Sequence, residues 1–319
     1  MPSADRPFRF GLQVRGDNSA DNLRSTAIAA ESAGFDVLST FDHVGAHWSA
    51  LTPLMAMAAA TERIRVCPLV LNNDFWHPVH LAREVAAIDH VTGGRFELGI
   101  GAGHAHTEYA AIGATFDPPR IRKARMAEAI EIVRRLLDGE EVTHRGDHYS
   151  IEGVRTMRSR QDHLPILVGV NGRAALAHAA QHADIIGLTL LGKTLPDGHQ
   201  HEVRWQSARL DATVAQLAEE GRGRTPELNV LVQRIVVTDD REAAAAEIVA
   251  AVPSLDLEDA LETPFLLLGT HDEIAAQIVA ARDRWGVSYF TVRDLDALAP
   301  VIARLAHGDQ GQRPSAPAG

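Results

Sequence analysis

The sequence predicts a single (β/α)₈ barrel, an α/β fold, and three observations lead to this prediction. Short apolar runs rich in β-forming residues alternate with segments of helical periodicity, at the spacing of strand–helix units. Eight such units follow one another along the 319 residues. No Pro/Gly/Ser-rich linker separates them, so we expect one domain over residues 1–307. The Gly-, Pro-, Gln- and Ser-containing end, 308–319, predicts a disordered tail.

The strands and helices alternate in a regular order. Residues 64–71 form a near-continuous apolar run, which is typical of a parallel strand buried on both faces. The eight expected strands are 8–13, 37–41, 64–71, 96–100, 166–170, 185–188, 228–238 and 288–292. The expected helices are 21–32, 51–61, 81–91, 122–137, 174–182, 202–220, 241–251, 271–285 and 298–307.

Three segments interrupt this alternation. Residues 142–151 predict a small hairpin around Arg145-Gly146-Asp147. Residues 190–201 and 253–264 are expected to be irregular insertions, the second of them lid-like. Because active sites in barrels are built from the loops that follow the strands, we expect both insertions at the C-terminal face to shape a pocket.

The overall composition limits the class of partner. The chain has 31 Lys plus Arg against 42 Asp plus Glu, and its net charge of −11 disfavours nucleic acid and anionic membranes as main partners. No apolar run is long enough to span a bilayer. The single cysteine, Cys67, lies in an apolar run and is expected to be a packed core thiol. We therefore expect a cytoplasmic protein.

Asp42 and His43 follow the second strand, and Trp48 lies in the loop beyond them. At the carboxyl end of a barrel strand, side chains point into the active-site mouth. An acid and an imidazole at this point therefore suggest chemistry, although the same pair can simply cap the following helix.

Two further strand ends carry residues that suit a ligand. Gly99, Gly101 and Gly103 follow the fourth strand and permit close backbone approach, or alternatively a tight turn. A dinucleotide-binding site is not expected, because position 104 is His where that fingerprint has its third glycine, and because these glycines follow the fourth strand of a barrel and not the first strand of a βαβ unit. Asn171-Gly172-Arg173 opens the helix after the fifth strand, where free amides hold anions or Asn171 caps the helix.

Several polar residues leave alternatives open. Asn72 and Asn73 with Trp76 suit the edge and wall of a heterocycle pocket, or an Asx turn beside core aromatics. The pairs His104/His106 and His199/His201 have the His-x-His spacing of some metal sites, but we expect no metal. Lys193 could bind an acidic substrate group.

Together these stretches resemble the luciferase-like monooxygenase superfamily, and specifically its coenzyme F420 branch. The resemblance covers about residues 8–306, and the Gly-Gly-Arg-Phe stretch at 93–96 is its most specific part. The matching stretches are 39–43 with Trp48, 71–78, 93–103, 168–172 and 183–187. The resemblance implies a barrel that holds a deazaflavin, with FMN as the alternative cofactor, and members are often homodimers.

The resemblance also implies roles for individual residues. His43 would transfer the proton, with His104 opposite it, and Asp42 would lie against the cofactor ring. A non-proline cis peptide around Val70, Leu71 and Asn72 would support the ring. The remaining cofactor contacts would come from Gly101, Gly103, Thr107, Asn171, Gly172 and Gly187. Substrate contacts would come from Trp48, Trp76 and Lys193.

One departure from the family pattern bears on the reaction. Sugar-phosphate dehydrogenases of the branch have a glutamate after the Gly-x-Gly, where this chain has His104. Glu108, about one turn later, is expected to be a weak substitute. The sequence therefore predicts hydride transfer to an unsaturated C=C, C=N or C=O group of a small molecule or modified peptide, rather than alcohol oxidation.

Three other functions remain open from the sequence. An FMN-dependent two-component monooxygenase would use the same histidine. A non-catalytic flavin-binding barrel is compatible with the same fold, because fold does not imply activity. A metal hydrolase is the weakest of the three.

Overall fold

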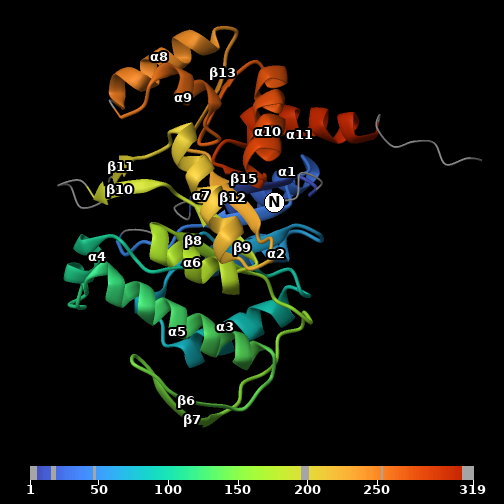
Figure 1. Cartoon of the computed structure of the whole chain (residues 1–319). Helices are drawn as coiled ribbons and strands as arrows, with labels where there is room; N and C mark the ends of the chain where they lie inside the picture. Colours follow the sequence, from blue (N-terminus) through green and yellow to red (C-terminus); the bar gives the residue numbers. More distant parts are fainter. Residues whose placement is uncertain (1–5, 16–18, 46–47, 195–200, 253, 311–319) are drawn as a thin grey trace, which may run out of the picture.

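The computed structural model describes residues 6–15, 19–45, 48–194, 201–252 and 254–310. Its centre is a parallel sheet of nine strands, in the order β3-β2-β1-β15-β12-β9-β8-β5-β4 (Figure 1). The strands are β1 (Arg9–Gln13), β2 (Val37–Thr40), β3 (Arg65–Pro68), β4 (Leu71–Asn72), β5 (Leu98–Gly101), β8 (Ile166–Val170), β9 (Ile185–Leu188), β12 (Glu227–Leu231) and β15 (Val287–Val292).

The sheet closes on itself. A parallel bridge pairs Val66 of β3 with Phe96, just before β5, so β3 and β4 are two halves of one barrel strand. Counted this way, eight strand positions surround the barrel axis. The predicted (β/α)₈ fold is confirmed.

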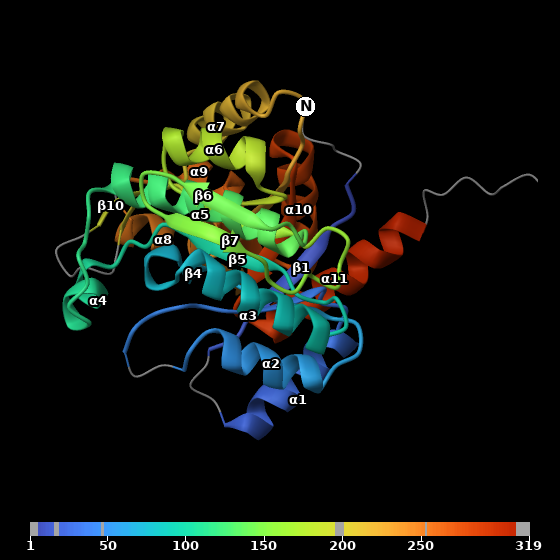
Figure 2. The same cartoon turned by 90° about the horizontal axis from the view of Figure 1, so that it is seen from below.

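Helices surround the barrel and bury their apolar faces against it (Figures 1 and 2). In α10, a Thr270/Glu273 capping box starts the helix and Gly286, with φ 71°, ends it. The helices are α1 (Ala20–Ser32), α2 (Leu51–Ala59), α3 (Pro78–Val91), α4 (His106–Ala111), α5 (Pro119–Leu137), α6 (Arg173–His182), α7 (Ser207–Glu220), α8 (Arg241–Ala251), α9 (Leu257–Glu262), α10 (His271–Trp285) and α11 (Leu295–Gln310). No helix in the described ranges is long and apolar enough to cross a bilayer.

Two expected strands are broken. The run 64–71 divides at a non-proline cis peptide bond between Leu69 and Val70, at the bend that the family resemblance implied. The expected strand 228–238 is also two strands, β12 and β13 (Arg234–Val237). β13 leaves the barrel because it pairs with β14 (Leu266–Gly269), a strand that the sequence analysis missed.

The insertions are more ordered than expected. Residues 190–201 were expected to be irregular, but β10 (Leu191–Thr194) pairs antiparallel with β11 (His201–Val203), which delays the start of the next helix to Ser207. The lid-like segment contains α9, whose first turn is capped by Asp256. The predicted hairpin is confirmed as β6 (Val142–Arg145) and β7 (Ser150–Val154), far below the barrel in Figure 1. The last helix continues to Gln310, three residues into the expected tail.

The amino end of the barrel is filled by ion pairs. Arg9 at the start of β1 contacts Glu97 at 2.5 Å and Glu227 at 2.6 Å, and Arg65 contacts Glu97 at 2.6 Å. The Arg9 guanidinium also lies 4.7 Å from the centre of the Tyr289 ring. We call Arg9, Arg65, Glu97 and Glu227 the floor network. Its members come from four barrel strand positions and join the strands at this end.

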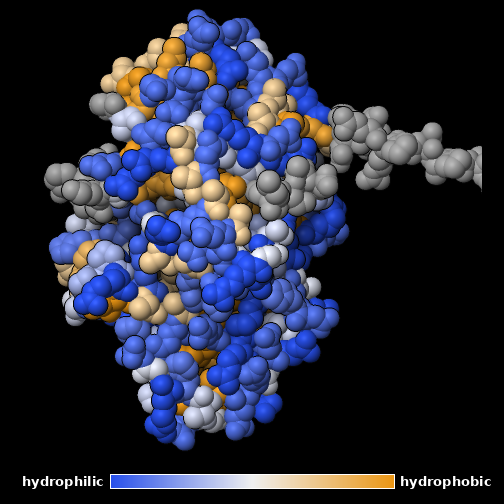
Figure 3. Space-filling model, in the orientation of Figure 1, coloured by the Kyte–Doolittle hydropathy of each residue, from blue (hydrophilic) through white to orange (hydrophobic). Residues whose placement is uncertain are grey.

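The outer surface is mainly hydrophilic on the face shown in Figure 3, with apolar residues in small groups. Cys67 is buried in the barrel, as expected. The two ends of the barrel differ from this surface because they contain buried polar and charged side chains.

Candidate active site

The carboxyl end of the barrel brings His43 and Glu108 together. His43 follows β2, and Glu108 lies in the short helix α4 after β5. His43 Nδ1 lies 2.5 Å from Glu108 Oε1. The Glu108 side chain is 5% exposed and that of His43 is 37% exposed, so the acid is buried beneath an imidazole that opens to the mouth.

The pair favours its charged form. The hydrogen bond from Glu108 raises the pKa of His43, against the opposing effect of burial. Burial favours the neutral acid at Glu108, but the hydrogen bond and charge of His43 outweigh it and lower the pKa of that carboxyl. Each group therefore stabilises the charged form of the other, and His43 in its protonated form can deliver a proton to the mouth.

This contact corrects the expectation that Glu108 is only a weak substitute for a missing acid. α4 begins at His106, and its first turn directs Glu108 inward while His106 and Thr107 remain exposed. A six-residue helix is too short to show helical periodicity in sequence. The carboxylate opposite His43 is thus present, four residues later than the family pattern places it.

Asp42 connects two strand ends. Its Oδ2 accepts the backbone N–H of Asn72 at 3.0 Å. Burial raises the pKa of Asp42, although the Asn72 bond opposes this. The alternative of helix capping is not what the structure shows, because α2 begins at Leu51 and no side chain caps its N-terminus.

His104 stands between His43 and the β10–β11 hairpin. Its ring centroid lies 5.6 Å from that of His43 and 5.0 Å from that of His201. Although the ring opens into the mouth, the protein around it and the charges of His201 and His43 lower its pKa. His104 is therefore a neutral imidazole at neutral pH. Among the described residues no cluster suits a metal ion, and His199 lies outside them.

The glycines at the end of β5 and just beyond it pack closely against their neighbours. A Cβ at Gly101 would lie 2.7 Å from Val70 Cγ2, and one at Gly103, whose φ is 72°, would overlap the Tyr109 hydroxyl. Arg122 donates to the carbonyls of Ala102 and Gly103. Both glycines are therefore required for packing, and their backbone borders the mouth.

Asn72 and Tyr109 hold α4 against the barrel. Asn72 Oδ1 accepts from Asp74 N and from Tyr109 Oη, both at 3.1 Å, so the expected Asx turn is present. Tyr109 Oη also lies 2.9 Å from Asp74 Oδ2, and Arg125 contacts Asp74 at 3.0 Å. This network fixes the residue next to Glu108.

The remaining predicted contact residues differ in their exposure. Trp48 is 41% exposed, whereas Trp76 packs against the core. The side chain of Lys193 lies outside the described residues. Thr107 is exposed on α4. Gly187 lies in the barrel interior, where a Cβ would meet Leu167 and Asn229.

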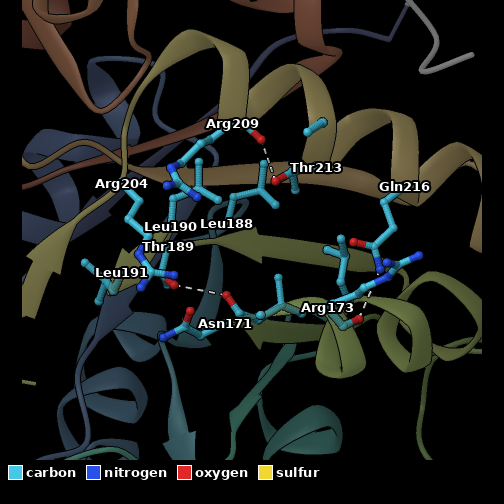
Figure 4. Close-up of a pocket in the computed structure, with 14 residues that line it drawn as sticks. Asn171, Arg173, Leu188, Thr189, Leu190, Leu191, Arg204, Arg209, Thr213 and Gln216 are labelled. Carbon is cyan, nitrogen blue, oxygen red and sulfur yellow. Dashed lines mark hydrogen bonds between the residues drawn. The ribbon is translucent and has the colours of Figure 1, made fainter. Parts of the chain in front are cut away.

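The start of α6 borders a cavity of about 210 Å³ (Figure 4). Gly172, with φ 84°, precedes the helix, and no side chain caps it, so Asn171 does not act as the expected N-cap. The helix amides are free for an anion. We call this space the arginine cavity; its polar wall includes Asn171, Arg173, Arg204, Arg209, Thr213 and Gln216. An uncapped helix start beside three guanidinium groups suits a phosphorylated cofactor.

Comparison with known proteins places these features in context. The family described as luciferase-like monooxygenase matches residues 6–260. An F420-dependent glucose-6-phosphate dehydrogenase of Nakamurella multipartita is 29% identical over 295 residues, covering 88% of this chain and 84% of that protein. A 5,10-methylenetetrahydromethanopterin reductase of Archaeoglobus fulgidus is 30% identical over 246 residues, covering 76% of this chain and 69% of the relative.

A solved structure shares the fold. The coenzyme F420 dependent tetrahydromethanopterin reductase of Methanopyrus kandleri superposes with a TM-score of 0.73 at 19% identity, covering 93% of this chain and 97% of that one. At this identity the likeness supports the architecture alone.

Proposed function

Because the chain belongs to the luciferase-like monooxygenase family, we propose that it is a deazaflavin-dependent oxidoreductase that uses coenzyme F420. It would transfer hydride between this cofactor and a C=O, C=N or C=C carbon of a small-molecule or modified-peptide substrate. The names of two relatives that match most of the chain support the choice of cofactor and reaction class. We also propose that the enzyme is a cytoplasmic homodimer; light scattering of the purified protein tests the oligomeric state.

The observation that carries the proposal is the His43–Glu108 pair, 2.5 Å apart at the mouth of the barrel. When bound, the deazaflavin would carry the hydride. His43 would deliver or accept the proton at the substrate heteroatom or carbon, and Glu108 would hold the imidazole in place and stabilise its charge. General acid–base help of this kind contributes roughly 10²- to 10⁴-fold in rate.

Other residues would bind the cofactor and substrate. Val70, Leu71 and Asn72 would lie beneath the ring, with Asp42 beside it and the backbone of Gly101 and Gly103 along its edge. The start of α6 would hold the phosphate, as its free amides suggest.

Trp48 and His104 would line the substrate side, where a neutral His104 can donate one hydrogen bond and accept another. Because Glu108 supplies the acid that seemed to be missing, the argument against alcohol oxidation no longer holds. Both directions of hydride transfer belong to the proposal.

The test is direct binding and turnover. The purified protein is titrated with F420 and with FMN by fluorescence, and reduced F420 is then mixed with enals, imines and ketones. Micromolar binding of F420 and oxidation of the reduced cofactor by one substrate class are expected. If F420 fails to bind more tightly than about millimolar, the proposal is wrong.

The family description also names monooxygenases, so FMN-dependent oxygenation is the second candidate. Oxygen consumption by the protein supplied with reduced FMN and the same substrates separates it from the first. Rapid oxygen uptake with FMN and none with F420 would favour this alternative.

A further inference from the structure

One buried arginine near the mouth has no acidic partner. Arg122 lies at the start of α5 and is only 6% exposed, yet no ion pair within the described residues includes it. The arginines of the floor network differ from it, because Arg9 and Arg65 both contact Glu97. A buried charge is costly unless other groups stabilise it, so the partners that Arg122 does have indicate what it is for.

The hydrogen-bond partners of Arg122 are backbone carbonyl groups. Its Nε donates to the Asp117 carbonyl at 2.9 Å, and its Nη1 donates to the carbonyl of Ala102 at 3.2 Å and to that of Gly103. Asp117 lies just before α5, whereas residues 102–105 connect β5 to α4. We call residues 102–105 the post-β5 loop. The guanidinium therefore joins this loop to the start of α5.

An aromatic contact extends the attachment to α4. The Arg122 guanidinium lies 4.1 Å from the centre of the Phe116 ring. The centre of that ring lies 4.8 Å from the ring centre of Tyr109 and 5.4 Å from that of His106, and both of these residues belong to α4. Because a cation is attracted to an aromatic face, the same guanidinium holds α4 as well as the post-β5 loop.

Both of the segments that Arg122 holds carry groups of the active site. The post-β5 loop carries His104, and α4 carries Glu108, whose Oε1 lies 2.5 Å from His43 Nδ1. A contact of this length depends on where α4 lies. The charge of Arg122 also acts on His104, because it helps to lower the pKa of that imidazole, after burial and the charges of His201 and His43.

We propose that Arg122 is a positioning residue of the active site: it holds the post-β5 loop and α4 in the arrangement that brings Glu108 to His43. Its hydrogen bonds within the described residues all go to backbone carbonyl groups, so it acts through the segments that it holds. The consequence for catalysis rests on the proposed function. The consequence for the His43–Glu108 contact rests on the geometry alone.

The test compares arginine variants along α5. Arg122→Gln removes the charge and most of the donors, and Arg122→Lys keeps the charge but not the planar set of donors. Arg120→Gln is the control for loss of one charge, because Arg120 is exposed in the same turn of the helix. Arg134→Gln is the control for lost stability, because Arg134 bonds to Leu164 and Asp184, which precede β8 and β9 at the amino end of the barrel.

The first measurement needs no cofactor. NMR of the imidazole protons follows the titration of His43, whose pKa is raised by the hydrogen bond from Glu108. In Arg122→Gln this contact should loosen, so the pKa of His43 should fall toward the ordinary histidine value of about 6.5. Arg122→Lys should show most of the same fall, whereas Arg120→Gln and Arg134→Gln should titrate like the native protein.

The second measurement is kinetic. In Arg122→Gln, kcat with F420 should fall about 10-fold because the proton-transfer pair is misplaced. The KM of the substrate should change less than kcat, because the substrate contacts proposed above remain. Arg134→Gln should keep the native kcat even though its melting temperature falls, which separates positioning from stability.

A second variant covers the case in which Arg122→Gln does not fold. Phe116→Leu removes the ring between the guanidinium and α4, and it should shift the pKa of His43 in the same direction by a smaller amount. An unchanged titration of His43 in the folded Arg122→Gln protein, or in Phe116→Leu where the first variant does not fold, would overturn the inference.

Two further outcomes complete the test. Full recovery of the His43 titration and of kcat by Arg122→Lys would also overturn the inference, because it would assign the effect to charge and not to the carbonyl groups that are held. If the titration shifts as expected but F420 does not bind to the native protein, the positioning of the His43–Glu108 pair is supported and the proposed function fails.

Discussion

At the amino end of the barrel, Arg9 and Arg65 are paired with Glu97 and Glu227, and each ion pair is enclosed by strands. At the carboxyl end, Glu108 is equally buried, but its partner His43 opens to the mouth, and Arg173, Arg204 and Arg209 line one cavity. Both ends hold charge that folding removed from water. Only the carboxyl end leaves part of that charge available to a ligand.

This difference separates stability from function in one fold. The charges of the floor network are paired across neighbouring strands and join them, although Glu97 Oε2 is buried without a hydrogen-bond partner among the described residues. Charges that are incompletely paired lower stability or add little to it, and they persist because a ligand completes them. The comparison predicts that substitutions at the two ends affect different measurements.

The largest effect is expected for His43→Ala. Loss of the proton-transfer group should lower kcat by about 10²- to 10⁴-fold, with little change in cofactor affinity. The melting temperature should fall less than in the Glu97→Gln variant, because the His43 ring is 37% exposed and Glu108 keeps its backbone hydrogen bond from Val44. Steady-state kinetics and thermal unfolding of the same preparation measure both. If the melting temperature falls as much as in a variant of the floor network such as Glu97→Gln, the comparison fails, because the His43–Glu108 pair would then contribute mainly to stability.

The next effect is expected for Glu97→Gln in the floor network. The change leaves Arg9 and Arg65 without their shared carboxylate, and loss of one partner of a buried pair costs about 3–5 kcal/mol of unfolding free energy. Denaturant unfolding measures it. The kcat of the folded fraction should be unchanged, and a changed pH profile of kcat would contradict the separation of the two ends.

The third prediction concerns pH and Glu108→Gln. Reduction needs protonated His43, whose pKa is raised, so the rate should fall as pH rises through that raised value. Oxidation in the reverse direction needs neutral His43, so its rate should rise as pH rises through the same value. The glutamine cannot stabilise the imidazolium charge, so the limb should move toward the ordinary histidine value of about 6.5. If the rate of reduction falls at the same pH in the native protein and in the Glu108→Gln variant, a group other than His43 controls the pH dependence.

The smallest effect is expected for Tyr109→Phe. The ring stays in place, but Asp74 and Asn72 lose a hydrogen bond, which should cost about 1 kcal/mol of stability. The Tyr109 hydroxyl bonds to Asn72 and Asp74 and not to His43 or Glu108, so kcat should fall less than in the Glu108→Gln variant. The kcat values of Tyr109→Phe and Glu108→Gln at one pH show whether catalysis depends on the position of α4 as well as on the Glu108 carboxylate.

Much of the barrel could be predicted because strand and helix periodicities alternate over long stretches. Residues 166–170 and 185–188 were predicted with the bounds that the structure gives them. The strand at 266–269 was missed because four residues between a proline and a helix carry too little periodicity. β13 was merged with β12 because the turn at Val232 and Gln233 contains no glycine or proline.

The candidate site was only partly predictable. The positions of Asp42, His43 and Gly172 follow from their place after barrel strands. The contact between Glu108 and His43 could not be predicted from the sequence, because the distance between them depends on the orientation of a single helical turn. Arg204 and Arg209 lie in or after an insertion, and nothing in their sequence spacing indicates that they share a cavity with Arg173.

The floor network also bears on how the barrel folds. Arg9 and Glu227 are separated by 218 positions in sequence, so their contact closes a long loop, and we expect it to form late in folding. Interactions of this kind are absent from an early transition state. We expect Glu227→Gln to leave the folding rate almost unchanged and to speed unfolding, as stopped-flow measurements of folding and unfolding rates would show. The ion pairs at the base of the barrel would then determine how long each folded molecule persists.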